Sequence, residues 1–247
     1  SNKEVEKFKK DVHTELEKWI TGAKPVLAKV DEKSRPKVLI DELGEKILEI
    51  FKPTNLIDAY AIYQGLREYW DETLKDDIYT IVEMGWLGSS KPVKLAPKAK
   101  DRVDYQIKKE KFHSETLPSE VLIAKFFSKE AQEIEALDEA LNQAGEALDN
   151  FDAENGGDEG LLRDYLNDKG RISKKDLSKF LRDSSIGKEE LEALKVYEGL
   201  AEKEDQSKES KKEKEAIFVD LIAKKYGSLT EQDVKNILIE NKWLKAI

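Results

Sequence analysis

The sequence predicts a mainly α-helical protein. Apolar residues recur at helical spacing over most of the chain, and the clearest stretch is a heptad-like seam within residues 119–154. Charged residues make up 38% of the 247 residues and apolar residues 39%, which is more charge and less apolar content than a compact globular domain usually has. This composition is typical of long helices that each bury one stripe of side chains and expose the rest.

The N-terminal part, residues 3–90, is expected to be helical with one short strand. Helices are predicted over about residues 3–30, 35–51 and 57–75, and Gly22 to Pro25 is expected to interrupt the first of them. Residues 78–82 are rich in isoleucine, valine, threonine and tyrosine, which favours the strand there. We expect the aromatic side chains of the third helix to pack within the fold.

A basic segment, residues 91–118, is predicted to be a linker or a hairpin. Residues 91–113 hold eight Lys/Arg against three acids, a net charge of +5. Val103, Tyr105 and Ile107 alternate with polar residues, as they would in a short strand. Basic side chains interleaved with aromatic ones suit contact with nucleic-acid phosphates. The alternatives are a solvated or partly disordered loop, and a segment that lies against the acidic helix that follows. The candidate DNA contacts are Lys98, Lys100, Arg102, Lys108, Lys109 and Lys111.

Residues 119–226 are predicted to form a long antiparallel, coiled-coil-like helical arm, with short helices at its tip in residues 155–187. Residues 202–215 contain no apolar residue but also no Gly or Pro, so we expect the second long helix to continue through them. A final helix is predicted within residues 227–247, with Thr230 and Asp233 capping its start. The apolar seam of the first long helix is expected to face a partner, and the candidate interface residues are Ile134, Leu137, Leu141 and Leu148.

Several kinds of chemistry have no support in the sequence. The chain has no cysteine, which excludes disulfides and fits a reducing, cytoplasmic compartment. It contains no apolar run long enough to span a membrane, and its polar start does not resemble a signal peptide. We expect no bound metal, because His13 and His113 are the only histidines and neither has a histidine four residues away. His113 is expected to be a solvated or contact residue rather than a base.

An ordered series of short motifs carries a family resemblance. The motifs are Asp58-Ala59-Tyr60 with Tyr63, Leu66 and Tyr69-Trp70, then Asp76-Asp77-x-Tyr79, Gly85-Trp86, Leu117-Pro118-Ser119-Glu120, Glu154-Asn155-Gly156-Gly157-x-Glu159-Gly160-Leu161-Leu162, Asn167-Asp168-Lys169-Gly170, Lys225-Tyr226-x-x-Leu229-Thr230 and Lys242-Trp243-Leu244. The series as a whole resembles the C-terminal part of type I restriction-modification methylase subunits, the modification subunits that methylate adenine N6 in DNA. Ser119 is a departure, because the family is expected to have a second proline there.

The resemblance implies an assembly and DNA-clasping role rather than catalysis. The sequence contains no Asn-Pro dipeptide and no glycine-rich S-adenosylmethionine loop, so the resemblance places the catalytic domain and its cofactor S-adenosylmethionine elsewhere in the parent protein. The chain alone is therefore expected to be inactive and to bind no cofactor. Its start lacks a methionine, which suggests a piece of a longer protein. The implied partners are the specificity subunit, the restriction subunit and DNA. The alternatives are a freestanding helical scaffold or adaptor without a DNA role, and an enzyme whose motifs we do not detect.

Overall fold

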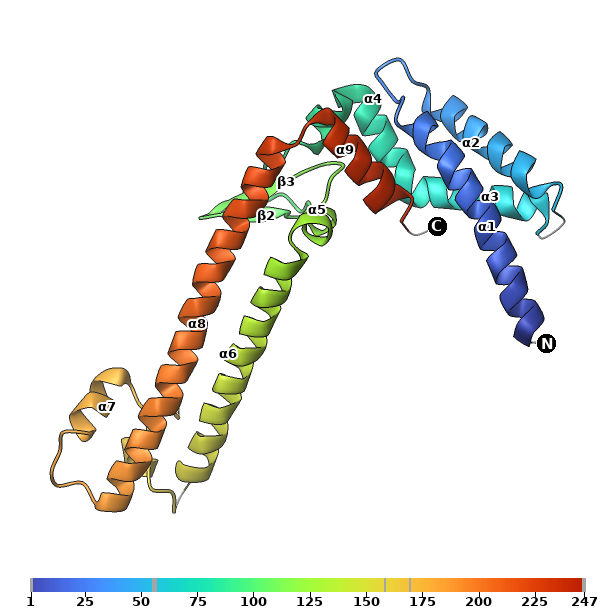
Figure 1. Ribbon diagram of the computed structural model, residues 1–247. Helices are drawn as coiled ribbons and strands as arrows, with labels where there is room; N and C mark the ends of the chain where they lie inside the picture. The colour runs from blue at the N-terminus through green and yellow to red at the C-terminus, as the bar shows by residue number, and fades with distance from the viewer. Residues whose placement is uncertain (1, 55–56, 158, 169, 246–247) are drawn as a thin grey trace. The chain divides into compact units, whose positions relative to one another are not determined.

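A computed structural model shows a mainly helical protein with one small antiparallel sheet, and this confirms the predicted fold class at that level (Figure 1). It describes residues 2–54, 57–157, 159–168 and 170–245; Lys169 of the quoted motif and the last two residues of the predicted C-terminal helix lie outside these ranges. The chain divides into two units. Unit 1 comprises Ser1–Phe127 and Val219–Ile247, and unit 2 comprises Ser128–Phe218.

Unit 1 begins with three helices that pack around buried tryptophans. They are α1 (Asn2–Leu27), α2 (Pro36–Phe51) and α3 (Ala59–Tyr69). The indole N–H of Trp19 donates to the Leu43 carbonyl at 3.0 Å and so ties α1 to α2. The expected interruption between Gly22 and Pro25 is wrong, because α1 continues to Leu27. Leu27 is fully buried, so packing of the last turn compensates for the hydrogen bond that Pro25 cannot donate.

The predicted strand at residues 78–82 is also wrong, because these residues lie in helix α4 (Lys75–Ser90). α3 runs through a π-helical turn, η1 (Trp70–Leu74), directly into α4. Leu74, Ile78 and Ile81 are all buried, and their spacing of four and three residues places them on one helical face. Burial of that face overrides the β propensity of the isoleucines. Gly85 has φ 74°, a conformation that favours glycine, and it marks a kink within α4.

The basic segment contains a three-stranded antiparallel sheet, so of the two predicted forms the hairpin is present. The strands are β1 (Val93–Lys94), β2 (Tyr105–Ile107) and β3 (Glu110–His113), in the order β1-β3-β2. Tyr105 and Phe112 are cross-strand partners, and their rings stack with centroids 4.9 Å apart. The β2–β3 turn passes through Lys108, which has a positive φ of 55°.

The predicted helix over 119–154 is two helices, α5 (Ser119–Phe126) and α6 (Ser128–Asn155), so the prediction of one continuous helix is wrong. Phe127 has non-helical angles, φ −133° and ψ 28°, and the break coincides with the boundary between the units. The sequence contains a signal for this break. Ser128 and Glu130 are residue types favoured at the start of a helix, where a hydroxyl and a negative charge satisfy free N–H groups.

In unit 2, α6 lies beside the long helix α8 (Lys188–Ser228), and the two run in opposite directions (Figure 1). Lys214 pairs with Glu133 at 2.8 Å, while Lys211 pairs with Asp138, so residue numbers rise along one helix as they fall along the other. α8 is continuous through residues 202–215, which confirms the prediction of a helix there.

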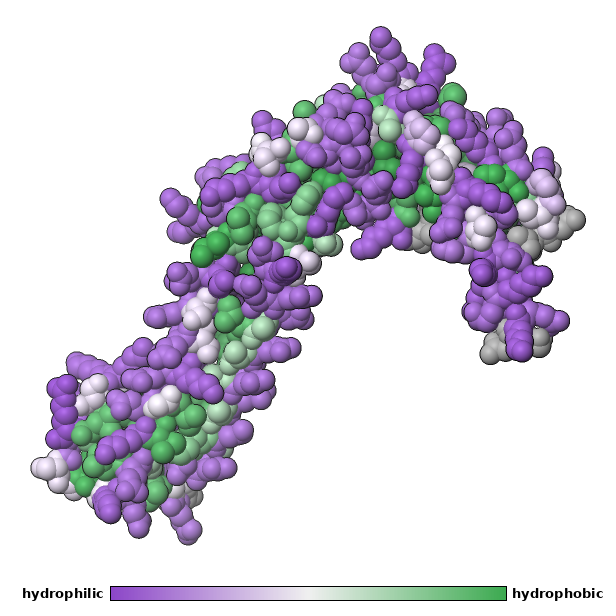
Figure 2. Space-filling model, viewed as in Figure 1, coloured by the Kyte–Doolittle hydropathy of each residue, from purple (hydrophilic) through white to green (hydrophobic). Residues whose placement is uncertain are grey.

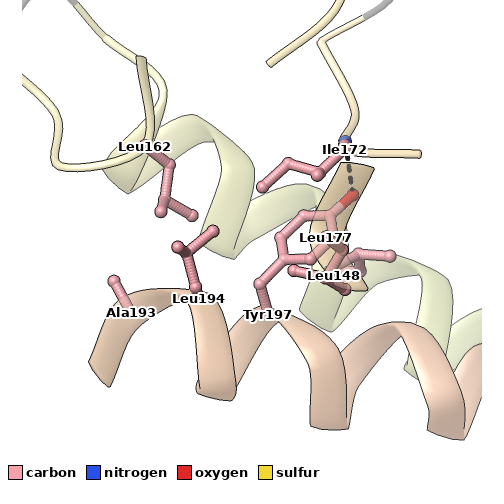
Figure 3. Packing of buried hydrophobic residues seen from close by; sticks show 7 residues of the cluster. All are labelled: Leu148, Leu162, Ile172, Leu177, Ala193, Leu194 and Tyr197. Carbon is pink, nitrogen blue, oxygen red and sulfur yellow. Dashed lines mark hydrogen bonds between the residues drawn. The ribbon is translucent and has the colours of Figure 1, made fainter. Parts of the chain in front are cut away.

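The end of unit 2 is closed by a small hydrophobic cluster beneath α7 (Lys174–Phe180) and the 3₁₀ turn η2 (Arg163–Tyr165) (Figure 3). The Tyr197 hydroxyl accepts the buried Ile172 N–H at 2.9 Å and so holds the connecting loop to α8. A Cβ on Gly160 would lie 2.1 Å from the Asn155 carbonyl oxygen, so only glycine fits this turn. The buried members of the cluster are Leu148, Leu162, Ile172, Leu177, Ala193, Leu194 and Tyr197.

The C-terminal residues return to unit 1. Helix α9 (Glu231–Ile237) begins with the capping box that the sequence predicts between Thr230 and Asp233. It continues into a π-helical segment, η3 (Leu238–Trp243), whose Trp243 is fully buried and lies 5.6 Å from Trp86 between ring centroids. The C-terminal segment is therefore part of the unit 1 core.

We predict that Tyr197→Phe destabilises unit 2 by about 1–3 kcal/mol, because the buried Ile172 N–H loses its acceptor. Hydrogen exchange at the Ile172 amide should become faster, and the unfolding transition followed by far-UV circular dichroism should move to lower denaturant concentration. All four tryptophans lie in unit 1, so the transition seen by tryptophan fluorescence should not move. Val196→Ala, at an exposed position on the same helix, is the control and should change stability by less than about 0.5 kcal/mol. Unchanged exchange at Ile172 in Tyr197→Phe would contradict this role.

Candidate functional site

Five of the six candidate DNA-contact side chains lie exposed on or beside the basic sheet. No ion-pair partner for them is found in the part of the chain that the structure describes. Lys108 and Lys109 form the β2–β3 turn, and Lys111 follows on β3. An unpaired, exposed ammonium group is free to approach a phosphate without first breaking an existing contact. The five are Lys98, Lys100, Lys108, Lys109 and Lys111.

Arg102, the sixth candidate, is used within the fold. Its guanidinium donates from Nε to Asp104 at 3.2 Å and from Nη2 to the Ser114 carbonyl at 2.7 Å. These bonds hold the chain before β2 against the chain that follows β3. We therefore assign Arg102 a structural role and remove it from the set of candidate DNA contacts.

A buried carboxylate, Asp104, organises this part of unit 1. Its side chain is fully buried and accepts the backbone N–H groups of Ser114 at 2.6 Å and Ser119 at 2.7 Å. Ser119 is the first residue of α5, so the negative charge lies where the helix dipole favours it. Together with Arg102, these bonds join the sheet to α5. In the sequence, Asp104 is only one of the three acidic residues that lower the net charge of the basic segment, and nothing marks it as buried.

His113 is buried, so of the two roles expected for it, the solvated one is wrong and the contact one fits. Its Nδ1 lies 3.4 Å from a carboxylate oxygen of Asp104 and its Nε2 lies 3.6 Å from one of Glu115. A histidine beside a buried carboxylate resembles part of an acid–base pair. The Asp104 oxygens, however, already accept backbone N–H groups and the Arg102 guanidinium. The Asp104 carboxylate is therefore used to hold the sheet, and the buried His113 Nδ1 makes no hydrogen bond within the described residues.

A second buried carboxylate, Asp77 on α4, holds the C-terminal segment. It accepts from the Lys242 ammonium at 2.5 Å and from the Trp243 indole N–H at 2.7 Å. Lys242 also donates to the Thr116 carbonyl at 2.7 Å, just before α5. Burial raises the pKa of the Asp77 carboxyl, while the Lys242 charge acts in the opposite direction. Three chain segments that are distant in sequence are thereby fixed to one another.

The end of α8 is fixed to the same region. The Tyr226 hydroxyl donates to the Leu117 carbonyl at 2.8 Å, and its ring lies 5.7 Å from the Tyr105 ring between centroids. Burial raises the pKa of the Tyr226 hydroxyl, so it remains a hydrogen-bond donor across the physiological range. The sheet that carries the exposed lysines is thus supported from α4, α5, α8 and η3.

The candidate partner-interface residues on α6 are not equivalent. Ile134, Leu137 and Leu141 are half-buried. Leu148 is only 2% exposed, because it belongs to the hydrophobic cluster at the end of unit 2. It is therefore not available to a partner, and we remove it from the interface set. Figure 2 shows apolar surface at the α7 end of unit 2, bordered by hydrophilic side chains.

Nothing in the described residues indicates metal binding or a membrane span. No three His, Cys, Asp or Glu side chains gather as metal ligands there. Of the helices in those residues, none is both long enough and apolar enough to cross a bilayer.

Comparison with known proteins gives no relative. No protein-family model matches the chain, and no curated protein or solved structure matches it either.

We predict that Asp104→Asn destabilises unit 1 by about 2–4 kcal/mol, because two backbone N–H groups and a guanidinium lose a buried charged acceptor. The unfolding transition followed by tryptophan fluorescence should move to lower denaturant concentration, since every tryptophan lies in unit 1. Asp101→Asn, at an exposed position three residues earlier, is the control and should have an effect below about 0.5 kcal/mol. Equal stability of the two variants would show that Asp104 does not organise the sheet.

Proposed function

We propose that this chain is an assembly and DNA-contacting module of the modification subunit of a type I restriction-modification DNA methyltransferase. The observation that carries the DNA part is the set of exposed, unpaired lysines on a well-supported β hairpin. The family part rests on the ordered motif resemblance. The module itself supplies no catalytic residue and no S-adenosylmethionine site; both belong to the parent subunit, which works in the cytoplasm with the specificity and restriction subunits.

The charge distribution supports different binding partners for the two units. Residues 128–218 contain 15 Lys/Arg and 25 Asp/Glu, a net charge of −10, which leaves +1 for the rest of a chain with net −9. Phosphates would be repelled by unit 2 and not by unit 1. DNA contact therefore belongs to unit 1, and unit 2 is suited to contact with protein.

The α6–α8 pair is proposed to act as a coiled-coil-like arm that receives helices of the specificity subunit. Ile134, Leu137 and Leu141 remain half-buried beside α8, so a third helix could cover the apolar surface that the pair leaves exposed. The alternative function is a freestanding helical scaffold or adaptor without a DNA role. It is favoured if the lysine hairpin proves not to bind DNA.

The DNA part is tested by the triple variant Lys108→Gln, Lys109→Gln and Lys111→Gln. Duplex DNA binding should weaken, and the slope of log affinity against log salt should become shallower by roughly 2–3, since each lost phosphate contact contributes about 0.9. The matched control is Lys203→Gln, Lys208→Gln and Lys212→Gln, which removes the same charge from exposed positions of α8 in unit 2 and should leave the slope unchanged. The same salt slope for both triples would remove the hairpin from the DNA interface.

The assembly part is tested by Leu137→Asp with Leu141→Asp. Co-purification of the specificity subunit should fall at least about tenfold, because two charges would have to be desolvated in the helix bundle. Ala136→Asp with Ala140→Asp places the same charges on exposed positions of the same helix and should retain the partner. The proposal fails if the leucine variant stays folded by circular dichroism and still retains the specificity subunit.

A further inference from the structure

A hollow of about 540 Å³ lies in unit 1 where the turn after α1 meets the start of α2. It is separate from the lysine hairpin and from α6, which carry the proposed function. Its lining contains four cations, one acid and an apolar floor. The lining residues are Pro25, Val26, Lys29, Val30, Lys33, Ser34, Arg35, Val38, Leu39, Glu42 and Lys46.

Three of the cations form no salt bridge with a described residue. Lys29, Lys33 and Arg35 are exposed, and the described residues offer them no ion-pair partner; only Lys46 is paired, with Glu42 at 3.4 Å. Asp31 and Glu32 lie in the same turn as Lys33, but neither lines the hollow, whose four cations and one acid give its lining a net charge of +3. The hollow therefore attracts negative charge, although the chain as a whole is acidic.

The turn that carries these cations is held in one conformation. The Asp31 carboxylate accepts the backbone N–H of Lys33 at 3.0 Å and the Ser34 hydroxyl at 2.9 Å. These bonds lower the pKa of Asp31, so it stays ionised and keeps its acceptor role. A preformed turn lowers the entropy lost on binding.

The floor of the hollow is aliphatic. Val30 and Leu39 are buried beneath it, while Val38 is 58% exposed at its rim. Val38 lies off the buried face of α2, so its isopropyl group is left in solvent beside the floor. No aromatic ring lines the hollow, so a nucleobase would find no stacking surface there.

We propose that this hollow binds an acidic segment of a protein partner that inserts one aliphatic side chain. Lys29, Lys33 and Arg35 would pair with carboxylates of the segment, and the aliphatic residue would cover Val38 and the floor. Cations around an apolar pocket match the pattern of a buried anchor with a charged rim. DNA could satisfy the cations but would leave the apolar floor uncovered.

The test uses the full chain and a short fluorescein-labelled peptide of Asp, Glu and Ser residues with one central leucine. Fluorescence anisotropy should show binding to the unaltered chain. Lys33→Glu with Arg35→Glu should weaken it by about tenfold or more, and Val38→Ser by about threefold to tenfold. The control, Lys208→Glu with Lys212→Glu, makes the same charge change at exposed positions of unit 2 and should not alter peptide affinity. Tryptophan fluorescence verifies that each variant is folded.

Three results would overturn the proposal. One is no peptide binding at all. Another is equal peptide affinity for the unaltered chain and the Lys33→Glu, Arg35→Glu variant; if that variant also loses duplex DNA affinity, the hollow is assigned to nucleic acid. The third is unchanged affinity when serine replaces the leucine of the peptide, which would leave the hollow only a patch of positive charge. Since the DNA test of the hairpin uses different lysines, its outcome and this one are independent.

Discussion

The buried Asp104 carboxylate is the interaction on which the candidate DNA surface depends. An ionised group is costly to bury unless nearly all of its hydrogen-bond capacity is used. Here the oxygens accept from the start of α5, from the end of β3 and from Arg102. A sheet of three very short strands would be marginal alone, and this carboxylate joins it to the helices around it. In the same way, the ion pair between Asp77 and Lys242 joins the C-terminal segment to α4.

This rigidity bears on the DNA contact that we propose for the hairpin. Phosphate contacts made by lysines on a mobile loop must compensate for the entropy of ordering that loop. Lysines on a hairpin that is fixed from behind lose less freedom on binding. The same reasoning applies to the turn between α1 and α2, where Asp31 accepts the Lys33 backbone N–H and the Ser34 hydroxyl and so orders the backbone next to Arg35. Unit 2 differs from unit 1 in two respects. Its net charge is strongly negative, and its apolar residues form one cluster and a half-buried seam.

Local signals in the sequence predicted most of the helical segments, the capping box at Thr230 and the continuity of α8 through residues 202–215, since each depends on spacing within a few residues. The strand predicted at residues 78–82 failed because burial of Ile78 and Ile81 on one helical face outweighs their β propensity. Asp77, Asp104 and the hollow beside Val38 could not be predicted. Each depends on contacts between segments far apart in the sequence, and a buried aspartate has the same sequence signature as an exposed one.

The central claim is that unit 1 contacts DNA through the hairpin while unit 2 contacts protein through α6. Hydrogen exchange of the full chain, measured with duplex DNA and separately with the specificity subunit, tests it most directly. The account predicts that DNA slows exchange in residues 105–113 and leaves α6 unchanged, and that the specificity subunit slows exchange in α6 around Leu137 and leaves the hairpin unchanged. Slower exchange in α6 on addition of DNA, or no change in the hairpin, would contradict it.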